Sequence, residues 1–267
     1  MVNIHIGCAG WDYKDWIGPF YPKKLEKFQY LNYYSHFFEL VEINSTFYNL
    51  PSEETVINWT MQVPENFRFI VKLWQEITHN IHSSDLDDKV YQFYYRMKPL
   101  ESKISAFLFQ FPPWLKYSEE ILKKLIHLID TFPFKNSILV IELRDNSWFD
   151  KQILSQFIDG ERKILGTTYM PKFSPYYLSN QKYYYIRLIG DRELTVFNRI
   201  QRNQDEAISH LNENINILII EPEINEVFII VNNHFAGFAP GTANLIKKKL
   251  NLQIKQYSKQ KNIGDFI

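Results

Sequence analysis

Two glutamates and one lysine lie at positions where a buried strand would deliver a reactive side chain. Glu42, Lys72 and Glu142 each follow a short apolar run, where ionised groups are rare unless paired or functional. Two carboxylates in one cavity can have their pKa values driven apart, so that one serves as acid and the other as base. A lysine amine forms a Schiff base when burial suppresses its charge, and otherwise it holds an anion. We therefore predict Glu42, Glu142 and Lys72 as catalytic residues.

Further polar and aromatic residues follow similar runs and suit substrate binding. Arginine recognises phosphate or carboxylate through paired hydrogen bonds, and amides orient a substrate or donate to a developing oxyanion. The predicted substrate-binding residues are Asn44, Gln110, Arg144, Arg187, Asn232, Trp11 and His79. Counted together, the five charged residues of this set carry about one excess positive charge, which favours an anionic ligand. They are Glu42, Glu142, Lys72, Arg144 and Arg187.

Other interpretations of these residues stay open. The charged group could be a network of salt bridges that only stabilises the fold. No H-x-H or H-E-x-x-H spacing surrounds His79 or His234, so no metal site is predicted. Cys8, the single cysteine, is expected to be a small buried hydrophobe rather than a nucleophile. Four aromatic residues near the N-terminus could either form a wall on which a ligand stacks or pack in the core. This aromatic group is Trp11, Trp16, Phe20 and Tyr21.

Eight short β-rich runs recur along the chain and predict eight strands. Several are apolar without alternation, as in parallel strands covered on both faces. Helical patterns lie between most of them, which favours a single-domain α/β fold, a closed (β/α)₈ TIM barrel, over an open doubly wound sheet. No glycine-rich nucleotide loop follows any run. The runs are Val2–Cys8, Glu39–Ile43, Phe67–Leu73, Ile104–Gln110, Ser137–Leu143, Arg162–Thr168, Lys182–Leu188 and Glu226–Asn232.

The helices between these strands have recognisable starts. Ser52 and Ser118 each precede two glutamates, as an N-cap with acids in the first turn does. The connection at Met170–Pro175 differs, because its two prolines predict an irregular loop in place of the helix after strand six. Further helices are expected over Asp85–Leu100, Phe149–Ile158, Asp205–Ile215 and Thr242–Leu250.

Size and composition fit one domain. The chain has 267 residues, and we assign residues 1–251 to the barrel and residues 252–267 to a polar C-terminal tail. Thirty basic residues balance thirty acidic ones, without the basic excess of a protein that grips duplex DNA. A lone cysteine forms no internal disulfide, and no signal peptide or membrane-spanning run is visible, so we predict a cytoplasmic protein. No cofactor is predicted.

The residues also resemble one family. The segments 7–11 (Gly-Cys-Ala-Gly-Trp) and 41–48 (Val-Glu-Ile-Asn-Ser-Thr-Phe-Tyr) resemble the opening of the YecE-like family, also called domain of unknown function 72. The similarity continues through 109–113, 142–144 and 231–233 and spans nearly the whole chain. It implies a TIM barrel and brings no established activity. Cys8 and Ala9 stand where we expect Thr or Ser in the family, which argues further against a nucleophilic thiol.

We therefore expect a metal-independent enzyme of the hydrolase, lyase or isomerase type. Its substrate would be small and anionic or polyhydroxylated, bound where the strands end. A nucleic-acid-binding or processing protein is the alternative from another class, although the neutral charge disfavours it. A non-catalytic binder of small ligands is another. For a functional cavity, Glu142→Gln and Lys72→Met should each destabilise the fold by less than about 1.5 kcal/mol, below the cost of breaking a buried ion pair.

Overall fold

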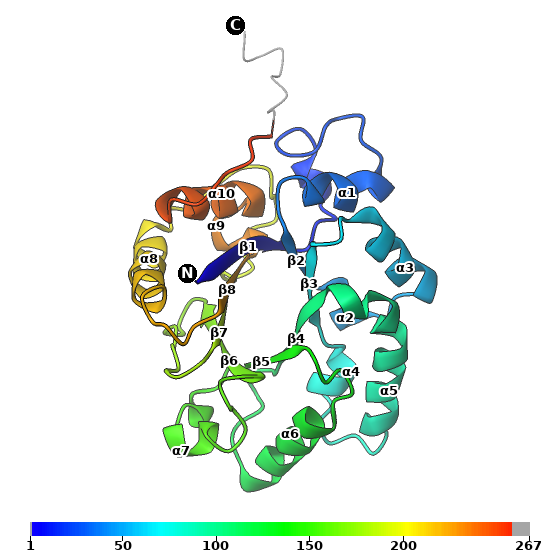
Figure 1. The fold of residues 1–267 in the computed structure, drawn as a ribbon, viewed down its shortest axis with the longest axis vertical. Helices are drawn as coiled ribbons and strands as arrows, with labels where there is room; N and C mark the ends of the chain where they lie inside the picture. The colour runs from blue at the N-terminus through cyan, green and yellow to red at the C-terminus, as the bar shows by residue number, and fades with distance from the viewer. Residues whose placement is uncertain (1, 258–267) are drawn as a thin grey trace, which may run out of the picture.

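The computed structural model describes residues 2–257, and its centre is a closed barrel of eight parallel strands (Figure 1). Each strand pairs with the next along the chain, and β8 pairs with β1 to close the barrel. The predicted TIM barrel is confirmed, and each predicted run overlaps one strand. The strands are β1 (Asn3–Ala9), β2 (Leu40–Ile43), β3 (Arg68–Lys72), β4 (Ile104–Gln110), β5 (Ile138–Glu142), β6 (Lys163–Tyr169), β7 (Tyr183–Leu188) and β8 (Glu226–Val231).

Alternate residues of each strand point into the barrel or outward to the helices, because side chains alternate along a strand. The inward residues fill the barrel as one buried cluster: Ala9, Leu40, Ile70, Ala106, Leu108, Val140, Ile164, Tyr185, Phe228 and Ile230. Glu42 lies two residues beyond Leu40, and Lys72 lies two beyond Ile70. Their side chains therefore continue the inward face at the C-terminal ends of the strands.

The helices surround the barrel (Figure 1), and the two predicted N-caps are confirmed. The side-chain oxygens of Ser52 and Ser118 each accept a backbone N–H bond, from Thr55 and Ile121. The helices are α1 (Tyr30–Ser35), α2 (Ser45–Tyr48), α3 (Glu53–Gln62), α4 (Gln75–Thr78), α5 (Leu86–Met97), α6 (Glu119–Thr131), α7 (Lys151–Leu154), α8 (Asp205–Leu218), α9 (Asn233–Ala236) and α10 (Ala239–Lys249). Short 3₁₀ helices are η1 (Lys14–Trp16), η2 (Lys27–Gln29), η3 (Lys98–Lys103) and η4 (Asn146–Trp148).

Two predicted helices are longer than the observed ones. The first is α7, which covers only part of the range 149–158. The carboxylate of Asp159 accepts the backbone N–H groups of three following residues, Glu161, Arg162 and Lys163. Gly160 then adopts φ +76°. The chain turns into β6 at this point. Closer to the helix, the N–H groups of Gln156 and Phe157 already bond to carbonyls three residues back, so regular α-helical bonding stops near Leu154. The α5 helix likewise ends at Met97, where η3 with Pro99 follows, and not at Leu100.

The loop between β6 and β7 contains no helix, which confirms the prediction for Met170–Pro175. Its backbone is anchored where the carbonyl oxygen of Tyr176 accepts a 2.8 Å hydrogen bond from the Thr167 hydroxyl. The rings of Phe173 and Tyr176 pack against Phe149, with centroid distances of 5.4 and 5.2 Å. The loop is therefore held against the segment that follows β5.

Part of the predicted tail packs on the barrel domain. The ring of Tyr257 lies 4.9 Å from that of Phe20 and 5.8 Å from that of Phe37. Residues 258–267 of the predicted tail lie outside the described residues. Across residues 2–257, no helix combines the length and apolar character that crossing a membrane requires.

Charged side chains also gather at the N-terminal end of the barrel. Arg68 donates to both carboxylate oxygens of Glu226, at 2.8 and 3.0 Å. The two ring nitrogens of His5 lie 3.1 Å from a carboxylate oxygen of Glu39 and 3.4 Å from one of Glu226. These ion pairs join β1, β3 and β8 at the end opposite the predicted site.

Candidate active site at the barrel mouth

Arg187 on β7 joins the two predicted catalytic glutamates at the C-terminal end of the barrel. Its Nη2 donates to Glu42 Oε1 at 2.8 Å, and its Nη1 donates to Glu142 Oε2 at 2.7 Å. Both glutamates are fully buried. Tyr185, two residues before Arg187 on the same inward face, donates its hydroxyl to the other oxygen of Glu42. The glutamates and Arg187 therefore form one desolvated network.

Arg144 completes the pairing of Glu142. Its Nε and Nη2 lie 2.8 and 2.7 Å from Glu142 Oε1, so that both carboxylate oxygens face a guanidinium group. Burial raises the pKa of Glu142, but the charges of Arg187 and Arg144 outweigh it and lower that pKa to about 2. Glu142 is therefore ionised at neutral pH.

Lys72 is buried without a carboxylate partner. Its side chain forms no ion pair with any residue between 2 and 257, and its Nζ lies 3.6 Å from the ring centroid of Phe47. The residue is 6% exposed. Burial first, and the positive charge of Arg187 second, lower the pKa of Lys72 to about 7. Lys72 therefore has a far larger share of neutral amine, the reactive form of a lysine, at neutral pH than an ordinary lysine has.

These residues surround a cavity, the mouth cavity, of about 160 Å³. It is lined by Tyr13, Asn44, Tyr48, Lys72, Arg144, Arg187, Ile189, Arg192, Phe197, Asn232, Asn233 and His234. Cationic side chains line it, whereas the glutamates lie beneath Arg187 and outside its lining. A small anion would therefore meet positive charge on several sides.

Several buried polar atoms at the mouth have no hydrogen-bond partner in the described part of the chain. They are Nδ2 of Asn233, Nδ1 of His234 and the hydroxyl of Thr168. Asn233 and His234 line the mouth cavity, and Thr168 is the register partner of Arg187 across β6 and β7. Buried polar groups are normally hydrogen-bonded, so unsatisfied donors and acceptors beside a cavity are typical of a site that binds a polar ligand.

The predicted substrate-binding residues divide into two groups. Asn44, Arg144, Arg187 and Asn232 line the mouth cavity. The remaining three do not line it, and each has another environment.

Gln110 donates its side-chain amide to the carbonyl of Phe111 at 2.8 Å. His79 packs its ring on Phe47 and Trp114, and burial, together with the charges of Lys72 and Arg144, lowers its pKa to about 4. Trp11 lies in a neighbouring groove, edge-on to Trp59 at 5.6 Å. The neutral ring of His79 and the other two side chains thus surround the mouth cavity without forming its wall.

Several residues of the site were not predicted from the sequence. Tyr185 was detectable, because it precedes Arg187 by two residues and therefore shares its inward face. Tyr13, Arg192 and Phe197 lie in loops, and no local pattern indicates that these loops fold over the mouth. Asn233 holds part of this arrangement, since its side-chain oxygen accepts the indole N–H of buried Trp16 at 3.1 Å.

Three members of the aromatic group, and Cys8, belong to the core, whereas Trp11 lines the neighbouring groove. Trp16, Phe20 and Tyr21 are at most 1% exposed, so these three rings form packing rather than an accessible wall. Cys8 is fully buried, and burial raises the pKa of its thiol to about 12. A neutral buried thiol is a poor nucleophile, as the sequence indicated.

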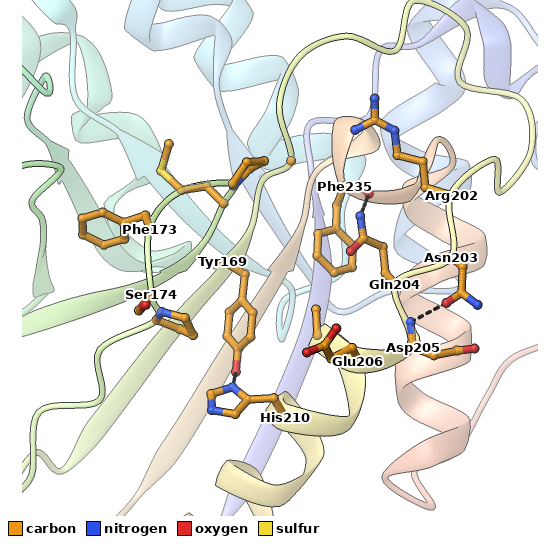
Figure 2. Close-up of a pocket in the computed structure, with 15 residues that line it drawn as sticks. Tyr169, Phe173, Ser174, Arg202, Asn203, Gln204, Asp205, Glu206, His210 and Phe235 are labelled. Carbon is orange, nitrogen blue, oxygen red and sulfur yellow. Dashed lines mark hydrogen bonds between the residues drawn. The ribbon is translucent and has the colours of Figure 1, made fainter.

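A separate hollow of about 730 Å³ lies between the loop after β6 and the start of α8 (Figure 2). Tyr169 and His210 meet on one side of it, with a hydroxyl-to-Nδ1 distance of 2.9 Å. None of the predicted site residues lines this hollow. The loop at Met170–Pro175 forms a wall of it and not of the mouth cavity.

The fold and the site define a single TIM barrel with a cationic cavity where its strands end. The chain belongs to the family described as protein of unknown function DUF72, whose model matches residues 5–263. The family resemblance seen in the sequence is thereby confirmed.

Relatives and solved structures agree with this membership. UPF0759 protein YunF of Bacillus subtilis (strain 168) is 26% identical over 94% of this chain and 95% of its own length. UPF0759 protein YecE of Escherichia coli (strain K12) is 31% identical over 55% of this chain and 51% of its own. Crystal structures of DUF72 family proteins from Thermotoga maritima (TM-score 0.76, 24% identity) and Enterococcus faecalis (TM-score 0.73, 27% identity) cover 93% and 95% of this chain and 99% of each of their own.

Proposed function

We propose that this protein is a metal-independent enzyme that acts on a small anionic substrate in the mouth cavity, with Lys72 as its reactive group. The observation that carries the proposal is the environment of Lys72. Its amine is buried, lacks a carboxylate partner among residues 2–257 and has a pKa of about 7. Natural proteins rarely bury an unpaired lysine unless it is functional.

The proposed chemistry is Schiff-base formation with a carbonyl substrate, of the lyase or isomerase type. The neutral amine of Lys72 attacks the carbonyl carbon and a C–N bond forms. Loss of the carbonyl oxygen as water then leaves an imine. The protonated imine withdraws electrons from a neighbouring C–C or C–H bond, which weakens that bond.

The arginines supply substrate recognition in this proposal. Arg144 and Arg187 line the mouth cavity, and Arg192 stands at it as well, so an anionic group of the substrate lies between guanidinium groups. A guanidinium group has five N–H donors, and the ion pairs of Arg187 with the glutamates leave donors for a ligand.

The glutamates act mainly through Arg187 in this proposal. Glu42 and Glu142 fix its guanidinium plane from two sides, and the two negative charges balance part of the cationic cluster. The acid and base roles predicted for them from the sequence would require a proton path around Arg187. We therefore propose them as positioning residues first.

Borohydride trapping tests the proposal. The protein is incubated with pyruvate or dihydroxyacetone phosphate and sodium borohydride, and the adduct is located by mass spectrometry. We expect covalent modification at Lys72, absent in Lys72→Met. Lys247→Met is the matched control, because Lys247 is also a buried lysine, 4.9 Å from the Phe38 ring centroid, but lies on α10 away from the mouth cavity.

The results separate catalysis from binding. If no carbonyl compound modifies Lys72 but anions still raise the melting temperature of the wild type, the protein is a small-ligand binder. If neither occurs, the charged cluster serves the fold alone.

A further inference from the structure

Another hollow, the side groove, adjoins the mouth cavity. It has a volume of about 960 Å³ and lies between the segment after β1 and helices α2 and α3. Tyr13, Asn44 and Tyr48 line both the side groove and the mouth cavity. The two spaces therefore lie next to each other at these three residues.

The side groove presents aromatic surface that the fold leaves uncovered. Phe28 is 72% exposed and Tyr48 is 58% exposed, and they come from different segments, η2 and α2. Trp11 and Trp59 contribute two further rings to the lining. Exposed aromatic side chains gathered around a hollow are typical of a binding surface, since single exposed rings need no such grouping.

The polar groups of the side groove are mostly uncharged. Asn49, Thr55 and Gln62 line it, and the side-chain oxygen of Gln62 is buried without a hydrogen-bond partner in the described part of the chain. Asp12 and Lys27 neutralise one another at 2.7 Å. Glu26, whose side chain accepts the backbone N–H of Gln29, leaves the lining with one excess negative charge. The groove therefore lacks the cationic character of the mouth cavity and offers hydrogen bonds rather than positive charge.

We propose that the side groove is a carbohydrate subsite, so that the ligand of this protein is a sugar that carries an acidic group. The acidic group lies in the mouth cavity and a sugar ring lies in the side groove. Sugars have apolar C–H faces that pack on aromatic rings and hydroxyl edges that bond to amides and hydroxyls, and the groove has both kinds of partner. This inference rests on the proposed anion site.

Calorimetric titration tests the inference with four probes: inorganic phosphate, glucose 6-phosphate, trehalose 6-phosphate and uridine 5′-monophosphate. We expect trehalose 6-phosphate to bind at least tenfold more tightly than inorganic phosphate. Phe28→Ala should remove most of that gain and leave phosphate affinity within about twofold, because Phe28 lines the groove and not the mouth cavity. Tyr95→Ala, which truncates an aromatic residue of α5 that is 66% exposed, is the matched control and should keep the gain.

The outcomes distinguish the two proposals. Phosphate binding that Lys72→Met abolishes, without any gain from the sugar, overturns the carbohydrate subsite and keeps the anion site. If uridine 5′-monophosphate gains more affinity over phosphate than trehalose 6-phosphate does, and Phe28→Ala removes that gain, the groove binds a nucleobase and the carbohydrate proposal is wrong. If no probe binds, the anion site itself is wrong. Trp11→Phe keeps an aromatic ring at its position in the groove. It should therefore retain the sugar gain, because the proposed subsite depends on aromatic surface.

Discussion

Arg187 and Glu142 form a buried ion pair, with Nη1 and Oε2 2.7 Å apart and side chains 5% and 0% exposed. The same guanidinium group binds Glu42, so one arginine holds two strands of the barrel, β2 and β5, through charge. Removing one partner of such a pair leaves the other charge buried and uncompensated. This geometry changes what we expect of mutations at the site.

Glu142→Gln should destabilise the protein by about 3–5 kcal/mol, the cost of breaking a buried pair. The substitution leaves Arg144 without its carboxylate and Arg187 with Glu42 alone. The sequence-based expectation of less than about 1.5 kcal/mol did not include this double pairing. Denaturant unfolding measures the difference. Glu65→Gln is the control, because the Glu65 side chain is 92% exposed in its ion pair with Lys103, and it should cost little.

Lys72→Met should destabilise the protein by less than about 1.5 kcal/mol, well below the loss for a broken buried pair. No ion pair within residues 2–257 is lost, and methionine fills a similar volume beside Phe47. Wild type at a hundredfold excess of a binding anion should gain about 2.7 kcal/mol, and the variant should gain much less. A large loss of stability in the variant, with no anion response in wild type, would show that Lys72 is structural.

Modification of Lys72 should follow the neutral fraction of its amine. Because the pKa of Lys72 is about 7, the rate of borohydride-trapped adduct formation should rise between pH 6 and 8 and level off above that range. Stopped-time trapping with mass spectrometry measures the profile. A midpoint near 10.5, the ordinary value for lysine, would contradict the desolvated environment.

The N-terminal ion pairs should make stability depend on pH. Burial lowers the pKa of His5, but the carboxylates of Glu226 and Glu39 raise it more, so the net shift is upward from 6.5. A raised pKa stabilises the fold below pH 6.5 and loses that contribution as the pH rises through the folded-state value. The pKa values of Glu39 and Glu226 are lowered, so these carboxylates stabilise the fold above about pH 4.5, and that stabilisation is lost as the pH falls. The cluster therefore contributes most between pH 4.5 and 6.5.

Thermal melts of wild type and His5→Gln across pH 4 to 9 check this dependence. The gap in melting temperature should be largest near pH 6 and narrow toward pH 9. The exposed His36, changed to Gln, is the control and should leave the profile unchanged. A constant gap across the range would mean that His5 acts through packing alone.

The barrel was predictable from local patterns in the sequence. Strands of a parallel sheet wrapped by helices are buried on both faces, so each appears as a short apolar run, and the runs along the chain mark the strands closely. The caps at Ser52 and Ser118 were also predictable, because a cap depends on residues three positions apart. The strand ends likewise placed Glu42, Lys72 and Glu142 at one end of the barrel.

Which charged side chains meet depends on the three-dimensional fold. Glu42 and Arg187 are 145 residues apart, and their contact depends on how strand tilt and register arrange side chains around the closed barrel. That geometry gives Arg187 both glutamates and leaves Lys72 without one. The loops that bring Arg192 and Phe197 to the mouth carry no periodic pattern, because their positions are set by packing against the rest of the fold. Partner choice among buried charges is a long-range property, and no local pattern encodes it.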